Sequence, residues 1–151
     1  MSELGPAVDT VINRCLAIKP GEEVLVITDA GTRAIGDRLR DAAAEAGADA
    51  VLAVMTEREN DGTEPPPTIA AALEQATVFI APTSRSLSHT AARKRASDNG
   101  ARGATMPGVT ADMLGRVMAV DFDTMAKRSR AVAELLTEGS VAHVTCPRGT
   151  H

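Results

Sequence analysis

Aromatic side chains are nearly missing from this sequence, which has no Trp, no Tyr and two Phe. Proteins that hold single-stranded nucleic acid stack the bases on aromatic rings, and duplex binders carry an excess of Lys and Arg. Here 16 Lys and Arg stand against 20 Asp and Glu, so the net charge is −4. We therefore expect no nucleic-acid partner, and we interpret the basic run at 93–95 as a solvated helix face.

Cysteine is scarce, and long apolar runs are missing as well. Cys15 and Cys146 lie far apart and match neither a zinc-site spacing nor a redox motif. No apolar run approaches the roughly 20 residues that a membrane span needs. The N-terminus also lacks the charged-then-apolar pattern of a signal peptide. We expect a cytoplasmic chain with reduced thiols and no membrane partner.

The apolar residues that are present, 44% of the chain, fall into an alternating order of strands and helices. At 151 residues the length predicts one domain, 1–151. Alternation predicts an α/β fold: a doubly wound, mainly parallel five-stranded sheet with helices on both faces, Rossmann-like or flavodoxin-like. The predicted strands lie at 24–28, 50–55, 77–81, 102–106 and 141–146, and the first and third are continuous runs rich in strand-forming residues.

Two of the predicted helices have clear apolar stripes. The first, 7–18, presents apolar residues at i, i+3, i+4, i+7 and i+8, which makes Cys15 a small core residue. The last begins at a cap supplied by Asp121 or Asp123 and ends at Gly139. Its stripe has one small polar member: Met125, Ser129, Val132, Ala133 and Leu136.

The stretch 77–99 predicts a buried strand that leads into a helix through a turn rich in hydroxyl groups. Pro82 ends the strand because it cannot donate to a sheet ladder. Free N–H groups and the helix dipole favour anions at such a turn, so it is a candidate site for a carboxylate, phosphate or sulfate. The candidate ligand-binding residues are Thr83, Ser84, Arg85, Ser86, Ser88 and His89.

Simpler interpretations of this turn stay open. Ser86 or Ser88 could merely cap the following helix, and Arg85 could bridge to an acidic residue on a neighbouring loop. The connection at 56–67 is such a loop, since it is longer than usual, acidic and rich in Pro. Its carboxylates could ligate a metal or contact a partner, although a solvated loop stiffened by Pro is the simpler interpretation.

Motifs for catalysis do not form a finished active site. After the first strand, Gly31 and Gly36 are present, but the middle Gly of a dinucleotide fingerprint is absent, and no phosphate-loop motif occurs. The three His residues are scattered and lie near no Cys, so no zinc-ligand spacing is found. Ser86 and His89 could touch at a helix start, yet neither an orienting carboxylate nor an oxyanion arrangement accompanies them. We assign no catalytic and no metal residue.

Four ordered blocks of the chain resemble one family. They are residues 13–22 (NRCLAIKPGE) with 24–29 (VLVITD), 64–67 (EPPP), 86–93 (SLSHTAAR) and 104–110 (ATMPGVT). In these blocks the chain is similar to the aminopeptidase T-type leucyl aminopeptidases, also called thermophilic metalloprotease-like. A ring-cleaving dioxygenase branch that acts on dihydroxypyridines shares the scaffold, so the blocks indicate a superfamily better than a substrate.

The resemblance implies a two-domain, metal-dependent exopeptidase more than twice this length, with a divalent zinc or cobalt pair held by Glu, His and Asp of a C-terminal domain. This chain aligns only with the N-terminal α/β domain, so no catalytic position is carried over and no cofactor is expected in it. Two readings follow. Either the chain is the N-terminal piece of a metallo-aminopeptidase, inert alone and acting on peptides only with the missing domain, or it is a free-standing domain that binds a small anion. The turn-like end at 148–150 favours the first, and the missing domain together with the long loop favours a homo-oligomer.

Overall fold

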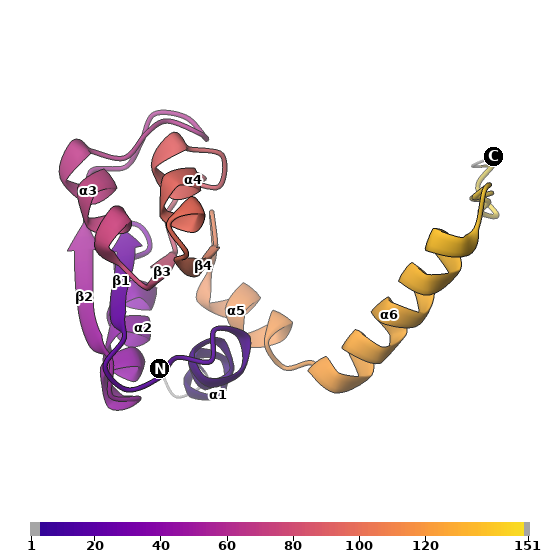
Figure 1. Cartoon of the computed structure of the whole chain (residues 1–151), viewed down its shortest axis with the longest axis horizontal. Coiled ribbons are helices and arrows are strands. Elements are labelled where there is room, and N and C mark those ends of the chain that lie inside the picture. The colour runs from indigo at the N-terminus through magenta and orange to yellow at the C-terminus, as the bar shows by residue number, and fades with distance from the viewer. Residues whose placement is uncertain (1–3, 150–151) are drawn as a thin grey trace. The chain divides into compact units, whose positions relative to one another are not determined.

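The computed structural model describes residues 4–149 and divides the chain into two compact units, Met1–Ala119 and Val120–His151 (Figure 1). The first unit holds all the strands of the described residues and is the α/β domain. Among its described residues, the second unit holds the helix α6 (Phe122–Glu138). The sequence predicts one domain over 1–151, whereas the structure places the α/β fold within the first unit alone.

The α/β domain is built on a parallel sheet. Its strands are β1 (Glu23–Thr28), β2 (Asp49–Val54), β3 (Val78–Ala81) and β4 (Arg102–Thr105). They pair in the order β2-β1-β3-β4, and every pair is parallel. All four lie where the sequence predicts strands, within one residue at each end. The predicted α/β class and parallel sheet are confirmed.

The prediction of a fifth strand at 141–146 is wrong, because the structure has no strand there. Val141 and Val144 of this segment are 86% and 68% exposed. A strand requires a neighbouring strand to satisfy its N–H and C=O groups, and the second unit contains no other strand among its described residues. The β-branched and apolar residues that predict a strand at 141–146 are therefore not sufficient to form one.

Residues on the buried strands alternate between two apolar layers. Val24, Val26, Val78 and Ile80 pack in one cluster with side chains of α1 (Gly5–Asp9), η1 (Thr10–Cys15), α2 (Arg33–Glu45) and α5 (Ala111–Val117). The residues between them, including Leu25, Ile27 and Phe79, pack on the other side against α3 (Pro67–Gln75) and α4 (Ala91–Asp98). Helices thus cover both faces of the sheet, as Figure 1 shows. This arrangement explains why the strand sequences are apolar throughout.

The first helix differs from its predicted form and corrects the position of Cys15. The α-helical turn of α1 widens into the π-helix η1, in which the Leu16 N–H donates to the Val11 carbonyl. A π-helix has more residues per turn than an α-helix, so the faces of its residues shift. Leu16 and Ile18 consequently remain buried, whereas Cys15 is exposed rather than part of the core.

Side chains cap both C-terminal helices, and the cap predicted for the last one is confirmed. Thr110 accepts a hydrogen bond from the Met113 N–H at the start of α5. Of the two candidates for α6, Asp121 is the cap, since its carboxylate accepts from the Asp123 and Thr124 N–H groups. The apolar stripe of α6 is present, but α6 buries none of its residues.

Candidate functional site

The order of the strands reverses between β1 and β3, so the carboxyl ends of these two strands meet at the point where α/β folds place ligands. Here the hydroxyl of Thr32, after β1, donates to the carbonyl of Pro82, after β3, over 2.5 Å. The hydroxyls of Thr28 and Thr32 lie 2.7 Å apart. These buried contacts close the gap between the two strand ends.

Asp29 is the central residue of this edge, and it is fully buried. Its Oδ2 accepts a hydrogen bond from the Ser84 N–H (2.6 Å), and its Oδ1 accepts from the Ser84 hydroxyl (2.8 Å) and the Gly31 N–H (3.1 Å). In the sequence analysis, Asp29 has no role beyond its place in the block 24–29. The position of Asp29 indicates a larger role, because an Asp that directly follows a buried central strand lies at the carboxyl edge of the sheet.

The candidate residues Thr83, Ser84 and Arg85 have contacts within the chain. Thr83 is buried, and its hydroxyl donates to the Arg85 carbonyl (2.6 Å). Ser84 is held by Asp29, as described above. The Nε of Arg85 lies 3.5 Å from a carboxylate oxygen of Glu57, so the predicted bridge from Arg85 to an acidic neighbouring loop is confirmed. Both partners of this ion pair are about half exposed, at 48% and 52%.

Ser86 and Ser88 shape the turn but do not cap α4, which corrects the capping interpretation. The Ser86 hydroxyl accepts from the Ser88 N–H (3.2 Å), and the Ser88 hydroxyl lies 2.7 Å from that of Thr105 at the end of β4. Thr90 is the cap of α4, because its hydroxyl accepts from the Arg93 N–H (3.3 Å). His89 is exposed.

A second cap on α4 comes from the long loop at 56–66. The carboxylate of Glu64 accepts from the first two N–H groups of the helix, those of Ala91 (2.5 Å) and Ala92 (3.1 Å). In the same loop, Asp61 accepts from the Ser86 N–H (2.7 Å). The loop therefore packs against the turn, and these two acidic side chains have specific partners.

The anion site that the sequence predicts requires free backbone N–H groups in this turn. In the structure, four of those donors already bind carboxylates of the chain itself: Ser84 binds Asp29, Ser86 binds Asp61, and the first two donors of α4 bind Glu64. Binding of an external anion remains a prediction, and it depends on the side chains of the turn or on displacement of these carboxylates.

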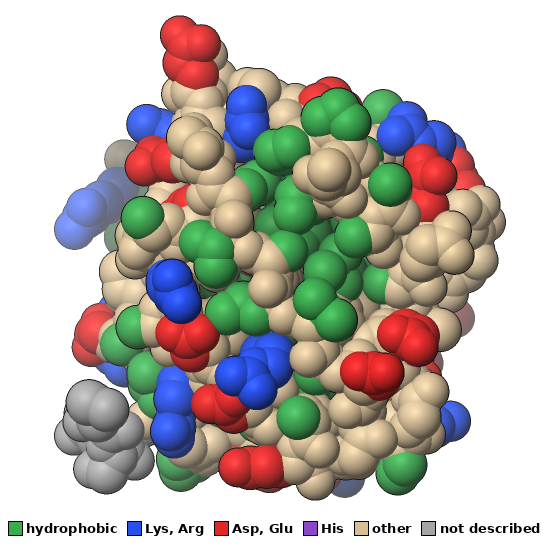
Figure 2. All heavy atoms as spheres, turned by 90° about the vertical axis from the view of Figure 1, so that its left-hand side faces the viewer, with side chains coloured by type: hydrophobic (Ala, Val, Ile, Leu, Met, Phe, Trp, Pro, Cys, Tyr) green, Lys and Arg blue, Asp and Glu red, His purple; other side chains and the backbone are tan. Residues whose placement is uncertain are grey.

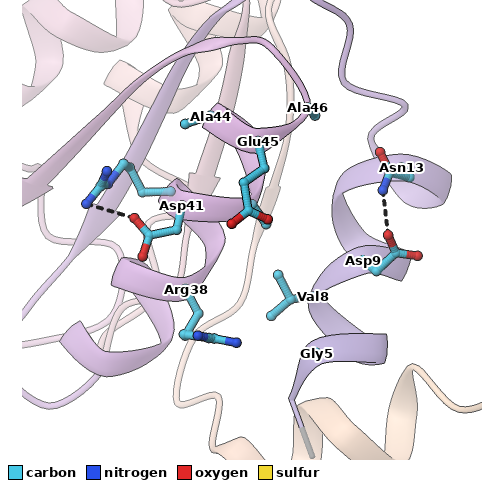
Figure 3. Close-up of a pocket in the computed structure, with 11 residues that line it drawn as sticks. Gly5, Val8, Asp9, Asn13, Arg38, Asp41, Ala44, Glu45 and Ala46 are labelled. Carbon is cyan, nitrogen blue, oxygen red and sulfur yellow. Dashed lines mark hydrogen bonds and ion pairs between the residues drawn. The ribbon is translucent and has the colours of Figure 1, made fainter. Parts of the chain in front are cut away.

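A polar pocket that sequence reasoning missed lies between α1–η1 and α2 (Figure 3). Its volume is about 590 Å³, and its charged lining includes Asp9, Arg38, Asp41 and Glu45. Asp9 accepts from the Asn13 amide (2.6 Å), and Asp41 pairs with Arg40 (2.8 Å). Figure 3 shows the Arg38 guanidinium extending toward α1. This pocket involves the end of α2 that is remote from the carboxyl edge of the sheet.

The strongest electrostatic feature lies where β4 begins. Arg102 donates from Nη1 and Nη2 to the two carboxylate oxygens of Glu22, over 2.7 Å and 2.6 Å, and from Nε to the Leu16 carbonyl. The hydrogen bonds from Arg102, together with one from the Lys19 N–H, lower the pKa of Glu22 from 4.5 to about 2. These hydrogen bonds connect the segment that follows η1 to β4, the strand at one edge of the sheet.

An apolar patch covers part of the opposite edge of the sheet. We define the β2–α3 patch as Leu25, Val51, Ala72 and Ala76, which line a groove of about 430 Å³ together with Glu23 and Gln75. Val51 is 53% exposed because α3 leaves the outer side of β2 uncovered. Figure 2 faces this side of the molecule and shows hydrophobic side chains gathered in its middle, with charged groups around them.

The ligand types of a metal site do not converge within residues 4–149. No group of at least three His, Cys, Asp or Glu in that range is placed to hold a metal ion. The described residues therefore do not fit the divalent metal pair that the family resemblance implies.

No helix in the described part of the chain is both long and apolar enough to span a bilayer. Comparison of the chain with models of protein families, with curated proteins and with solved structures found no match.

Proposed function

We propose that this chain is the non-catalytic N-terminal α/β domain of a metal-dependent leucyl aminopeptidase-like exopeptidase of the aminopeptidase T type. In this proposal the chain has the doubly wound, flavodoxin-like variety of the α/β fold, and the protein works in the cytoplasm. The observation that best supports a non-catalytic role is that the chain's own side chains occupy the carboxyl edge of the sheet. There the chain's own Asp29 accepts from the N–H and hydroxyl of Ser84, at the position where a ligand-binding α/β domain would leave donors open.

The hydroxyl groups of the turn support the same conclusion. A nucleophilic Ser needs a base that takes its proton. The Ser84 hydroxyl donates to Asp29, but this carboxylate also accepts two backbone N–H groups, whose hydrogen bonds favour its charged form and make it a weak base. The Ser88 hydroxyl pairs with another hydroxyl, that of Thr105. These arrangements stabilise a turn, and they do not activate a nucleophile.

A docking role is supported by the β2–α3 patch. Exposed apolar patches on soluble domains often mark interfaces, and this one lines a groove at which Val51 of β2 is about half exposed. We assign it to contact with a separate catalytic domain, which supplies the zinc or cobalt pair and the peptide-binding residues. If the parent enzyme belongs instead to the related ring-cleaving dioxygenase branch, this domain would have the same non-catalytic docking role.

The test is an activity and binding assay on the purified chain. After chelator washing and addition of Zn²⁺ or Co²⁺, we expect no turnover of a leucyl chromogenic substrate and no stoichiometric metal. A catalytic domain of an aminopeptidase T-type enzyme, expressed separately, should bind the chain, and Val51→Glu should abolish that binding. Val117→Glu is the matched control, because Val117 is equally exposed, at 54%, on α5. Metal-dependent turnover by the chain alone would overturn the proposal.

A second candidate function is the binding of a small anion at the turn 83–90. The long, half-exposed ion pair between Arg85 and Glu57 favours it, because such pairs contribute little and an anion can displace the carboxylate. Titration with sulfate should then shift the backbone amide resonances of the turn, and Arg85→Ala should remove the effect. Unchanged amide resonances in the wild-type chain would exclude this function.

A further inference from the structure

The polar pocket between α1–η1 and α2 is lined by two oppositely charged side chains without a partner in the described part of the chain. Its other acidic side chains, Asp9 and Asp41, have polar contacts within the chain. Arg38 and Glu45, by contrast, form no hydrogen bond or ion pair with any described residue. In Figure 3 no dashed line joins either of them to a neighbour. Both are exposed, so a molecule from solvent can reach them.

The Arg38 end of the pocket suits an anion. A guanidinium presents a planar fork of N–H donors that matches the two oxygens of a carboxylate. Asp41 lies three residues after Arg38, a spacing that allows an ion pair on a helix, but it pairs with Arg40 instead. Because Asp9 and Asp41 also line the pocket, they oppose a doubly charged phosphate more than a singly charged group. A carboxylate therefore fits this end.

The Glu45 end of the pocket suits a cation. Glu45 is the last residue of α2, where the carbonyl groups give a helix a partial negative charge. The last turn of α2 has no basic residue to offset that charge. An ammonium group at this end is attracted by the Glu45 carboxylate and by the end of the helix together.

The distance between the two ends restricts the ligand. Arg38 and Glu45 lie seven residues apart on α2, so their Cα atoms are separated by roughly 10 Å along the helix axis. An α-amino acid has both of its charges on one carbon atom and can satisfy only one end. Ala42 and Val8 also line the pocket, and Val8 faces α2 in Figure 3, so a methylene chain between the two charges has apolar atoms to contact. The pocket volume of about 590 Å³ is within the range usual for small-molecule sites.

We propose that this pocket binds a small linear ω-amino acid, with the carboxylate at Arg38 and the ammonium group at Glu45. Its methylene groups lie against Val8 and Ala42. The site is independent of the function proposed for the α/β domain, because the pocket shares no residue with the β2–α3 patch or with the turn 83–90.

The first test is a titration of the full chain with 6-aminohexanoate, followed by backbone amide resonances. We expect saturable shifts in α1, η1 and the second half of α2. Hexylamine and hexanoate each keep one charged group, and glycine keeps both on one carbon, so each should bind at least about threefold more weakly. Shifts that are absent, unsaturable or confined to other elements would overturn the proposal. Equal affinity for hexylamine or for hexanoate would also overturn it.

The second test uses substitutions at the two charged groups. Arg38→Gln and Glu45→Gln should each weaken binding of 6-aminohexanoate at least about threefold. Arg33→Gln removes a charge from the same helix outside the pocket and is the matched control, with no expected change. Unchanged affinity in either pocket variant would contradict the proposal.

Exchanging the two charges separates a specific role from a general loss of charge. Arg38→Glu and Glu45→Arg should each abolish binding when made alone. The double variant should recover binding, because the ligand can then bind in the reverse direction. Amide resonances outside the pocket show whether each variant keeps its fold. A folded double variant that binds no better than either single reversal would overturn the proposal.

Discussion

Replacing Glu22 by Gln tests whether the ion pair at the start of β4 stabilises the domain. Glu22 accepts from both terminal nitrogens of Arg102 and from the Lys19 N–H (2.8 Å). The guanidinium also donates to the carbonyls of Leu16 and Ala17. Gln can still accept one hydrogen bond, but it removes the negative charge opposite the guanidinium.

The size of the effect follows from the lowered pKa of Glu22. A fall from 4.5 to about 2 corresponds to an upper limit of roughly 3.4 kcal/mol, at 1.36 kcal/mol per pH unit. The side chain of Arg102 is 41% exposed, so solvent screens the pair and reduces this value. We expect Glu22→Gln to lower the free energy of unfolding by about 1–2 kcal/mol at neutral pH.

The pH dependence gives the sharper test. Because the folded-state pKa of Glu22 lies below its unfolded value, its stabilisation is fully present above pH 4.5 and is lost as the pH falls toward about 2. Urea unfolding of wild type and Glu22→Gln should therefore show a difference that shrinks steadily over this range. Glu23→Gln, an exposed neighbour, is the control. A difference between wild type and Glu22→Gln that is the same at neutral and acid pH would refute the reasoning.

Three further variants test the packing of the α/β domain by urea unfolding. Gly103→Ala should destabilise it by about 1–3 kcal/mol, because a Cβ there would overlap the backbone oxygen and ring of Phe79. Asp29→Ala should cost about 2–3 kcal/mol by leaving the half-buried N–H and hydroxyl of Ser84 unpaired, and equal stability would exclude a structural role for the carboxyl group. Glu64→Ala should cost about 1 kcal/mol through the lost helix cap, and sulfate should restore more stability to this variant than to wild type.

The strands of the α/β domain were predictable because each carries its own signal. The residues of β1 and β3 are apolar at successive positions, as expected when helices cover both faces of a sheet. Residues 141–146 also contain β-branched residues, Val141, Val144 and Thr145, and form no strand. The difference is the availability of a neighbouring strand, which no short stretch of sequence encodes.

The contacts of the candidate site were less predictable because they join distant parts of the chain. Ser84 lies 55 residues from Asp29, and Ala91 lies 27 residues from Glu64. Hydroxyl and acidic residues near Gly and Pro are common in turns, so composition alone does not identify these pairs. Only the order of the strands and the path of the 56–66 loop bring them together.

The attraction of N–H donors for negative charge explains both the predicted anion site and the carboxylates that the structure places at this turn. A turn at the carboxyl edge of a parallel sheet gathers N–H donors, and those donors attract negative charge. Here Asp29, Asp61 and Glu64 supply that charge from within the chain. A tethered group acts at a high effective concentration, of the order of millimolar or above, so a free anion must exceed it or bind more tightly. External binding through the backbone donors at Ser86 and the start of α4 therefore requires the 56–66 loop to move, and the response of the Glu64→Ala variant to sulfate measures how much that loop opposes it.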